Sequence, residues 1–243
     1  RALGLPAVWS PAPESGVNTP ARTLVDLSHA IEHGVVYYKG LPAPVICDYL
    51  SREDSRARYE PGTEFHIGRV ELITNTGTYI DCPFHRYADG RDTAAMPLER
   101  FVDQPTLVVR ATARQGRGID VAQISAQLVA SDVHGKAVLV HTGWDALWGT
   151  DAYFEGHPYL TEQAALWLRD AGAVLVGIDS FNIDNTDGGT RPVHTVLLRE
   201  EILIAEHLCN LQLLPNAGST FTAVPPKLVG VGTFPVRAFA TVP

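Results

Sequence analysis

The stretch from Thr74 to Arg86 reads Thr-Asn-Thr-Gly-Thr-Tyr-Ile-Asp-Cys-Pro-Phe-His-Arg. It places Asn75, Tyr79, Asp81 and His85 within eleven positions, directly after a run that resembles a strand. A phenol, a carboxylate and an imidazole are sufficient for proton transfer or for binding a metal ion. So dense a group of polar side chains predicts a site directed at a reacting molecule. The alternative is an ordinary polar turn, because short turns of this composition are common.

The composition is that of a globular protein. Apolar residues make up 45% of the 243 positions, charged residues 19%, and the formal net charge is −8. This acidic balance disfavours nucleic acid and anionic membrane surfaces as partners. No apolar run approaches the roughly 18 residues that cross a bilayer, so we expect no membrane span. We predict an N-terminal arm over residues 1–22, rich in Pro, Ala and Ser, and one mixed α/β domain over residues 23–243.

The cysteines are Cys47, Cys82 and Cys209, an odd number without a Cys-x-x-Cys pair. A disulfide framework is therefore not expected, and a reducing cytoplasm fits best. A nucleophilic Cys82 thiol is an alternative, but it needs an activating base beside it. In an extended segment its side chain points away from that of Asp81.

Apolar periodicity predicts alternating strands and helices. Thr161 is suited to cap the N-terminus of the clearest helix, and Gly172 to end it. A strand, this helix and a second buried strand follow one another between residues 136 and 178, which is typical of a βαβ unit. The expected strands cover residues 69–75, 105–113, 136–142, 173–178 and, in one or two pieces, 230–242; further helices are expected over 120–128 and 194–201.

A second pair of polar residues follows later in the chain. His194 and Glu206 are twelve residues apart, around an apolar segment. A short helix starting at His194 and a strand leading to Glu206 bring both groups to one edge of the sheet, although for this pair alone a capping histidine and a surface carboxylate are the simpler explanation. Gly-x-Gly-x-x-Gly, Walker, Gly-x-Ser-x-Gly and His-Glu-x-x-His motifs are absent, which disfavours nucleotide, serine-hydrolase and zincin chemistry.

The window Asn75 to His85 resembles the motif His-x-Gly-Thr-His-x-Asp-x-Pro-x-His of the metal-dependent cyclase-like hydrolase family, which includes kynurenine formamidases and isatin hydrolases. Five of its seven fixed positions match. The resemblance extends in the same order over residues 23–240. It is carried by Val25–His29, His141–Asp145, His157–Leu160, Gly177–Ser180, His194–Leu198, Glu206, Asn210–Leu211 and Pro235–Ala238. It implies a swivelling β/β/α domain and a homodimer or larger assembly.

The resemblance also implies a metal site with altered ligands. Asn75 and Tyr79 replace the two motif histidines, and an amide and a phenol are poor ligands for zinc. One divalent ion, Zn²⁺ or Mn²⁺, is then expected on Asp81, His194 and Glu206. The alternative is that no metal binds, and that Tyr79 and Asn75 donate hydrogen bonds to the developing oxyanion instead.

The expected function is hydrolysis of an amide, lactam or lactone in a small cyclic or aromatic substrate. His85 acts as general acid and base with Asp81 and Tyr79 beside it, and Asn75, Phe84 and Arg86 bind the substrate. Two alternatives stay open. One is a cyclase or lyase that removes a proton next to a carbonyl polarised by Tyr79, and the other is a small-ligand-binding protein without activity.

Overall fold

The computed structural model describes residues 22–113 and 115–242. Apart from residue 22, the predicted N-terminal arm lies outside these residues. Within them, nine strands form one mixed, curled sheet, and the predicted α/β class is confirmed. In spatial order the strands are β1 (Thr23–Asp26), β13 (Phe239–Val242), β11 (Ala217–Thr222), β5 (Gln104–Arg110), β7 (Ala137–His141), β9 (Leu175–Ile178), β10 (Leu203–Glu206), β4 (Tyr79–Asp81) and β12 (Thr233–Pro235).

The centre of this sheet is parallel and its flanks are antiparallel. Strands β5, β7, β9 and β10 run in the same direction. Strand β4 pairs antiparallel with β10 on one side and with β12 on the other. The buried strands expected at 136–142 and 173–178 are confirmed as β7 and β9, and the expected C-terminal strand is divided into β12 and β13.

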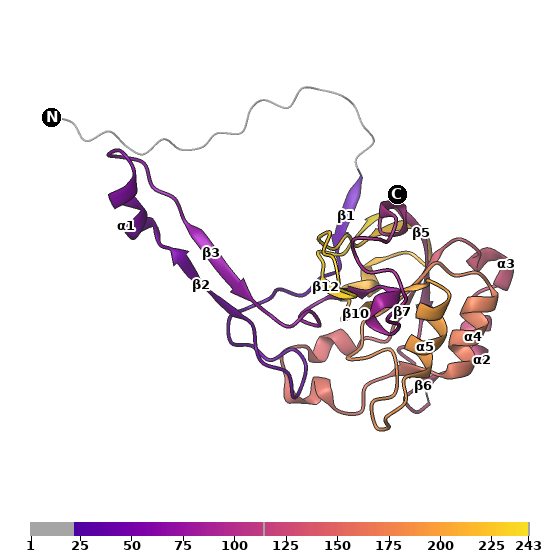
Figure 1. The fold of residues 1–243 in the computed structure, drawn as a ribbon. Coiled ribbons are helices and arrows are strands. Elements are labelled where there is room, and N and C mark those ends of the chain that lie inside the picture. Colours follow the sequence, from indigo (N-terminus) through magenta and orange to yellow (C-terminus); the bar gives the residue numbers. More distant parts are fainter. Residues whose placement is uncertain (1–21, 114, 243) are drawn as a thin grey trace.

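Both faces of the sheet are buried, as the continuous apolar runs require. Val138 and Val140 of β7 belong to one core cluster, whereas Ala137 and Leu139 belong to the other. Helices cover the face of Val138 and Val140, and Figure 1 shows them together on one side of the sheet. These helices are α2 (Val121–Ser125), α4 (Glu162–Asp170) and α5 (Pro192–Arg199), with α3 (Ala130–Val133) nearby.

The helix ends follow from local hydrogen bonds. The Thr161 hydroxyl accepts a hydrogen bond from the Ala164 amide at 3.2 Å and so caps α4, as predicted. Asp120 and Gln123 form a reciprocal capping box on α2. Two short parallel strands, β6 (Gly118–Ile119) and β8 (Tyr159–Leu160), pair beside these helices.

The strand predicted over residues 69–75 is wrong at its C-terminal end. Strand β3 (Ile67–Glu71) ends at Glu71, residues 72–78 form a loop, and the chain becomes extended again as β4. Strand β3 pairs with β2 (Val45–Leu50) in a separate hairpin, which carries α1 (Arg52–Ser55) and projects from the body of the molecule (Figure 1). Every residue of β3 is exposed, so the apolar residues of this strand do not mark a core face.

Candidate active site

Strand β4 positions the first part of the site. Successive side chains of a strand point to opposite faces, so Tyr79 and Asp81 share one face while Ile80 enters the core on the other. The register places Glu206 of β10 opposite Tyr79, and Thr233 of β12 opposite Asp81. Directly opposed residues in antiparallel strands lie close together. Sheet pairing alone therefore brings residues more than 120 positions apart into contact.

The first of these pairs is a phenol bound to a buried carboxylate. The Tyr79 hydroxyl donates to Glu206 Oε2 at 2.5 Å, and the backbone amide of Ile183 donates to Oε1 at 2.5 Å. Burial raises the pKa of both side chains, well above 10 for Tyr79. Because a tyrosine hydroxyl has one proton, Tyr79 cannot also donate to a substrate oxygen while it donates to Glu206.

The second pair orients His85. The Thr233 hydroxyl lies 2.5 Å from Asp81 Oδ1 and 2.7 Å from His85 Nδ1. Burial raises the pKa of Asp81, but His85 and His194 lower it more strongly, so that this carboxyl is ionised. An ionised carboxylate only accepts, hence Thr233 donates to Asp81 and accepts from His85 Nδ1–H. In the neutral imidazole, Nε2 then carries a free lone pair.

Helix α5 supplies His194. The carboxylate of Asp184 accepts hydrogen bonds from the amides of Val193 and His194 at the start of the helix, and lies 2.6 Å from His194 Nδ1. His194 Nε2 is therefore directed toward Asp81 Oδ2 at 3.7 Å and Glu206 Oε1 at 3.9 Å. Burial lowers the pKa of His194, but these carboxylates raise it to about 10.

Three of these side chains could hold a metal ion. Asp81, His85 and His194 place one ligand atom each within 4.8 Å of one another. Ligand atoms around a tetrahedral zinc ion are about 3.4 Å apart, so a small contraction suffices. Asp81 Oδ2 is buried and has no hydrogen-bond partner, so it is available to bind a cation. A carboxylate with two imidazoles suits Zn²⁺ or Mn²⁺.

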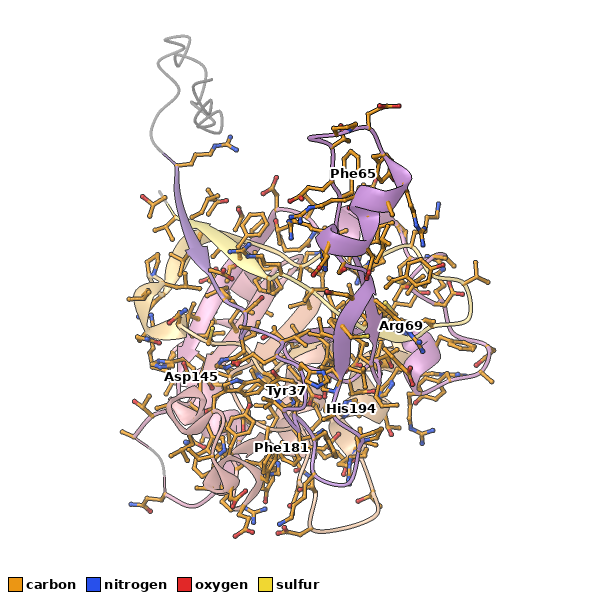
Figure 2. All side chains as sticks on the ribbon, turned by 90° about the vertical axis from the view of Figure 1, so that its left-hand side faces the viewer. Tyr37, Phe65, Arg69, Asp145, Phe181 and His194 are labelled. Carbon is orange, nitrogen blue, oxygen red and sulfur yellow. The ribbon has the colours of Figure 1, made fainter. Side chains whose placement is uncertain are left out.

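A cavity of about 210 Å³ opens onto this group. It contains Asn75 and Arg86, two of the predicted substrate-binding residues, but Phe84 does not line it. Figure 2 shows His194 in the body of the molecule, away from Phe65 near the end of the hairpin. The lining residues are Tyr38, Leu41, Asn75, Tyr79, His85, Arg86, Asn182, Arg191, His194 and Glu206.

The structure thus brings together the four residues that carried the sequence argument: Asp81, His85, His194 and Glu206. Sequence reasoning missed Thr233 and Arg191, because neither belongs to a recognised motif.

Cys82 has no part in the site. Its side chain is buried in an apolar cluster, and burial raises the pKa of the thiol to about 12. A thiol that stays protonated is a poor nucleophile, so the cysteine alternative is disfavoured.

Comparison with known proteins places this geometry in a family. Residues 25–185 match the Cyclase family, and the chain belongs to it. Two similar proteins are the kynurenine formamidases of Erythrobacter litoralis, 28% identical over 86% of this chain and 88% of the relative, and of Geobacillus thermodenitrificans, 31% identical over 71% and 78%. The chain is thus similar to enzymes named for formamide hydrolysis.

Solved structures show the same fold. An isatin hydrolase bound to the product analogue thioisatinate superposes with a TM-score of 0.77 at 24% identity, over 91% of this chain and 93% of that one. A potential metal-dependent hydrolase with cyclase activity superposes with a TM-score of 0.73 at 25% identity, over 92% of this chain and 99% of that one.

No helix in the described part of the chain is both long enough and apolar enough to span a membrane.

Proposed function

We propose that this protein hydrolyses an amide, lactam or lactone bond in a small cyclic or aromatic substrate. The observation that carries the proposal is the fixed orientation of His85, whose Nε2 lies 3.9 Å from Asp81 Oδ1 at the edge of the cavity. A third of this side chain is exposed, so it can contact a bound molecule. Family membership and the similarity to formamidases support the same reaction class.

In this reaction His85 Nε2 takes a proton from water as the water oxygen bonds to the carbonyl carbon. The C–N or C–O bond then breaks, and the leaving nitrogen or oxygen receives the proton from His85. A positioned acid and base of this kind contributes about 10²–10⁴-fold to the rate. Thr233 and Asp81 keep the imidazole in the tautomer that can accept the proton.

The donor set fits one divalent ion. Asp81, His194 and Glu206 would hold it, which leaves His85 Nε2 free to move the proton. Glu206 Oε1 lies 3.9 Å from His194 Nε2. When bound, the ion supplies positive charge that polarises a carbonyl.

The swivelling β/β/α assignment, the homo-oligomer and the cytoplasmic location stay predictions.

Turnover of small formamides, lactams and lactones in ¹⁸O-labelled water tests the proposal. Hydrolysis incorporates the label into the carboxylate product, and His85→Gln should reduce the rate by about 10²–10⁴-fold. Product without the label would favour the cyclase or lyase alternative. Binding of small aromatic ligands without turnover of any of the three compound classes would favour the inactive binding protein.

A further inference from the structure

Charged side chains line the cavity both at its buried end and at its opening to solvent. Its lining includes Glu206, whose side chain is 1% exposed, and the fully buried Asp81 lies behind it, next to His194. Its lining also includes Arg86, which is exposed, and Arg191, which is half-buried. Acidic groups therefore lie deep and two guanidinium groups lie toward solvent.

The two cavity arginines differ from most others in the protein. Within the described part of the chain, neither Arg86 nor Arg191 forms an ion pair with a carboxylate. Two positive charges without an acidic partner in one cavity form a site for an anion, because an arginine in a partly dry cavity gains most from a charged acceptor. Seven other arginines lie within 3.8 Å of a carboxylate: Arg56, Arg69, Arg91, Arg117, Arg169, Arg199 and Arg237.

Both guanidinium groups are held in place by neutral acceptors. Arg191 Nη1 donates to the carbonyl oxygens of Gly188 at 2.8 Å and Thr190 at 2.7 Å, and Arg86 Nε donates to Thr195 Oγ1 at 3.3 Å. A guanidinium has five N–H groups, so these contacts leave other donors for a ligand. Because the side chains are already ordered, binding costs less conformational entropy than it does for a free arginine.

An aromatic wall adjoins this positive rim. Tyr38 packs against Phe181 with ring centroids 4.6 Å apart, and it lines the cavity together with Arg191. An aromatic ring beside a guanidinium suits a ligand that joins an apolar body to an anionic group.

We propose that Arg86 and Arg191 bind the carboxylate of a small anionic substrate and direct its scissile bond toward His85. This inference rests on the proposed hydrolase function. Arg191 and Arg86 are thus specificity-determining residues, and the preferred substrates carry a carboxylate at the end remote from the reacting carbonyl.

Binding is measured first, because it does not depend on turnover. Isothermal titration calorimetry compares benzoate with neutral benzamide, which has a similar shape. We expect the wild-type protein to bind benzoate more tightly. Arg86→Gln and Arg191→Gln should each weaken benzoate binding by roughly 10–100-fold, the usual effect of losing a hydrogen bond to a charged group. Arg191→Lys should restore part of the loss, and benzamide binding should not change.

Arg237→Gln is the matched control. Arg237 is exposed and pairs with Asp26 at 2.9 Å, away from the residues that line the cavity. This variant should bind benzoate as the wild-type protein does. Thermal unfolding establishes that each variant is folded, and if Arg191→Gln is not, Arg86→Gln decides. Equal binding of benzoate and benzamide, or full benzoate affinity in a folded Arg86→Gln variant, overturns the proposal.

Turnover separates this inference from the proposed function. The pair is 4-formamidobenzoate and formanilide, which share the scissile formamide and differ in the carboxylate. We expect kcat/KM to favour 4-formamidobenzoate by roughly 10-fold or more, and Arg86→Gln to remove the preference. Equal hydrolysis of both compounds overturns the proposed anion site but agrees with the proposed hydrolase function. Arginine-dependent benzoate binding without hydrolysis of any substrate supports the anion site and contradicts the hydrolase function.

Discussion

Replacing Thr233 by valine tests the local geometry of the site, because valine keeps the shape and removes the hydroxyl. In the structure this hydroxyl donates to Asp81 Oδ1 at 2.5 Å and accepts from His85 Nδ1 at 2.7 Å. Thr233 is 2% exposed and Asp81 is fully buried, so water does not replace the lost donor. Asp81 Oδ2 already lacks a partner. The variant therefore leaves neither oxygen of a buried carboxylate hydrogen-bonded.

The magnitude follows from the charge on Asp81. Loss of a hydrogen bond to a charged group reduces the free energy of unfolding by about 1.5–3 kcal/mol. A domain of this size changes its melting temperature by about 2–4 °C per kcal/mol, so the expected decrease is about 3–12 °C. Without Thr233, His85 Nδ1 loses its acceptor and the imidazole is free to take the other tautomer. We expect kcat to decrease by about 10-fold or more, with a smaller change in KM.

The assay is thermal unfolding of metal-free protein, in a double-mutant cycle with Asp81→Asn. The two substitutions should be strongly non-additive, because they remove the same interaction. Thr220→Val is the control, since that hydroxyl makes only an exposed contact with Asp103 at 3.4 Å. A Thr233→Val variant with wild-type stability, wild-type kcat and zero coupling to Asp81 would refute the proposed orientation of His85.

Two further predictions concern packing and pH. Gly232→Ala should lower both stability and turnover, because its Cβ would overlap the backbone nitrogen of His85. Thermal unfolding and kcat measure this, and a neutral substitution contradicts it. Burial against Trp148 lowers the pKa of His29 to about 4, so this side chain stabilises the fold above pH 6.5 and loses that contribution as the pH falls toward 4. The free energy of unfolding decreases by about 2 kcal/mol over this range, after allowance for partial exposure. His29→Phe should remove this pH dependence, whereas the control His66→Ala should keep it. Unfolding measured at pH 7 and at pH 4.5 tests both.

Local signals explain why part of the fold was predictable. Strands β7 and β9 are continuous apolar runs, and α4 has a threonine cap with an apolar stripe, so their type follows from nearby residues. The predicted strand at 69–75 extends past the end of β3 at Glu71 because apolar residues, among them Val70 and Ile73, occur on both sides of that position. Both are exposed, Val70 on the projecting hairpin and Ile73 in the loop after it, and exposure is set by the rest of the molecule.

The site divides in the same way. Asp81 and His85 are close in sequence and form a motif, and the family resemblance assigned His194 and Glu206, already noted as a polar pair, to the same site. Thr233 is a single common residue that reaches Asp81 only through the pairing of β12 with β4, so no local pattern marks it.

Zinc binding to the metal-free protein, measured by calorimetry beside turnover, tests the central claim that Asp81 and His194 hold the ion while His85 moves the proton. We predict that Asp81→Asn and His194→Gln abolish both zinc binding and turnover. We predict that His85→Gln binds zinc with an affinity near that of the wild-type protein and loses about 10²–10⁴-fold in kcat. Loss of zinc in His85→Gln to the same extent as in Asp81→Asn would contradict this account, as would full turnover in any of the three variants.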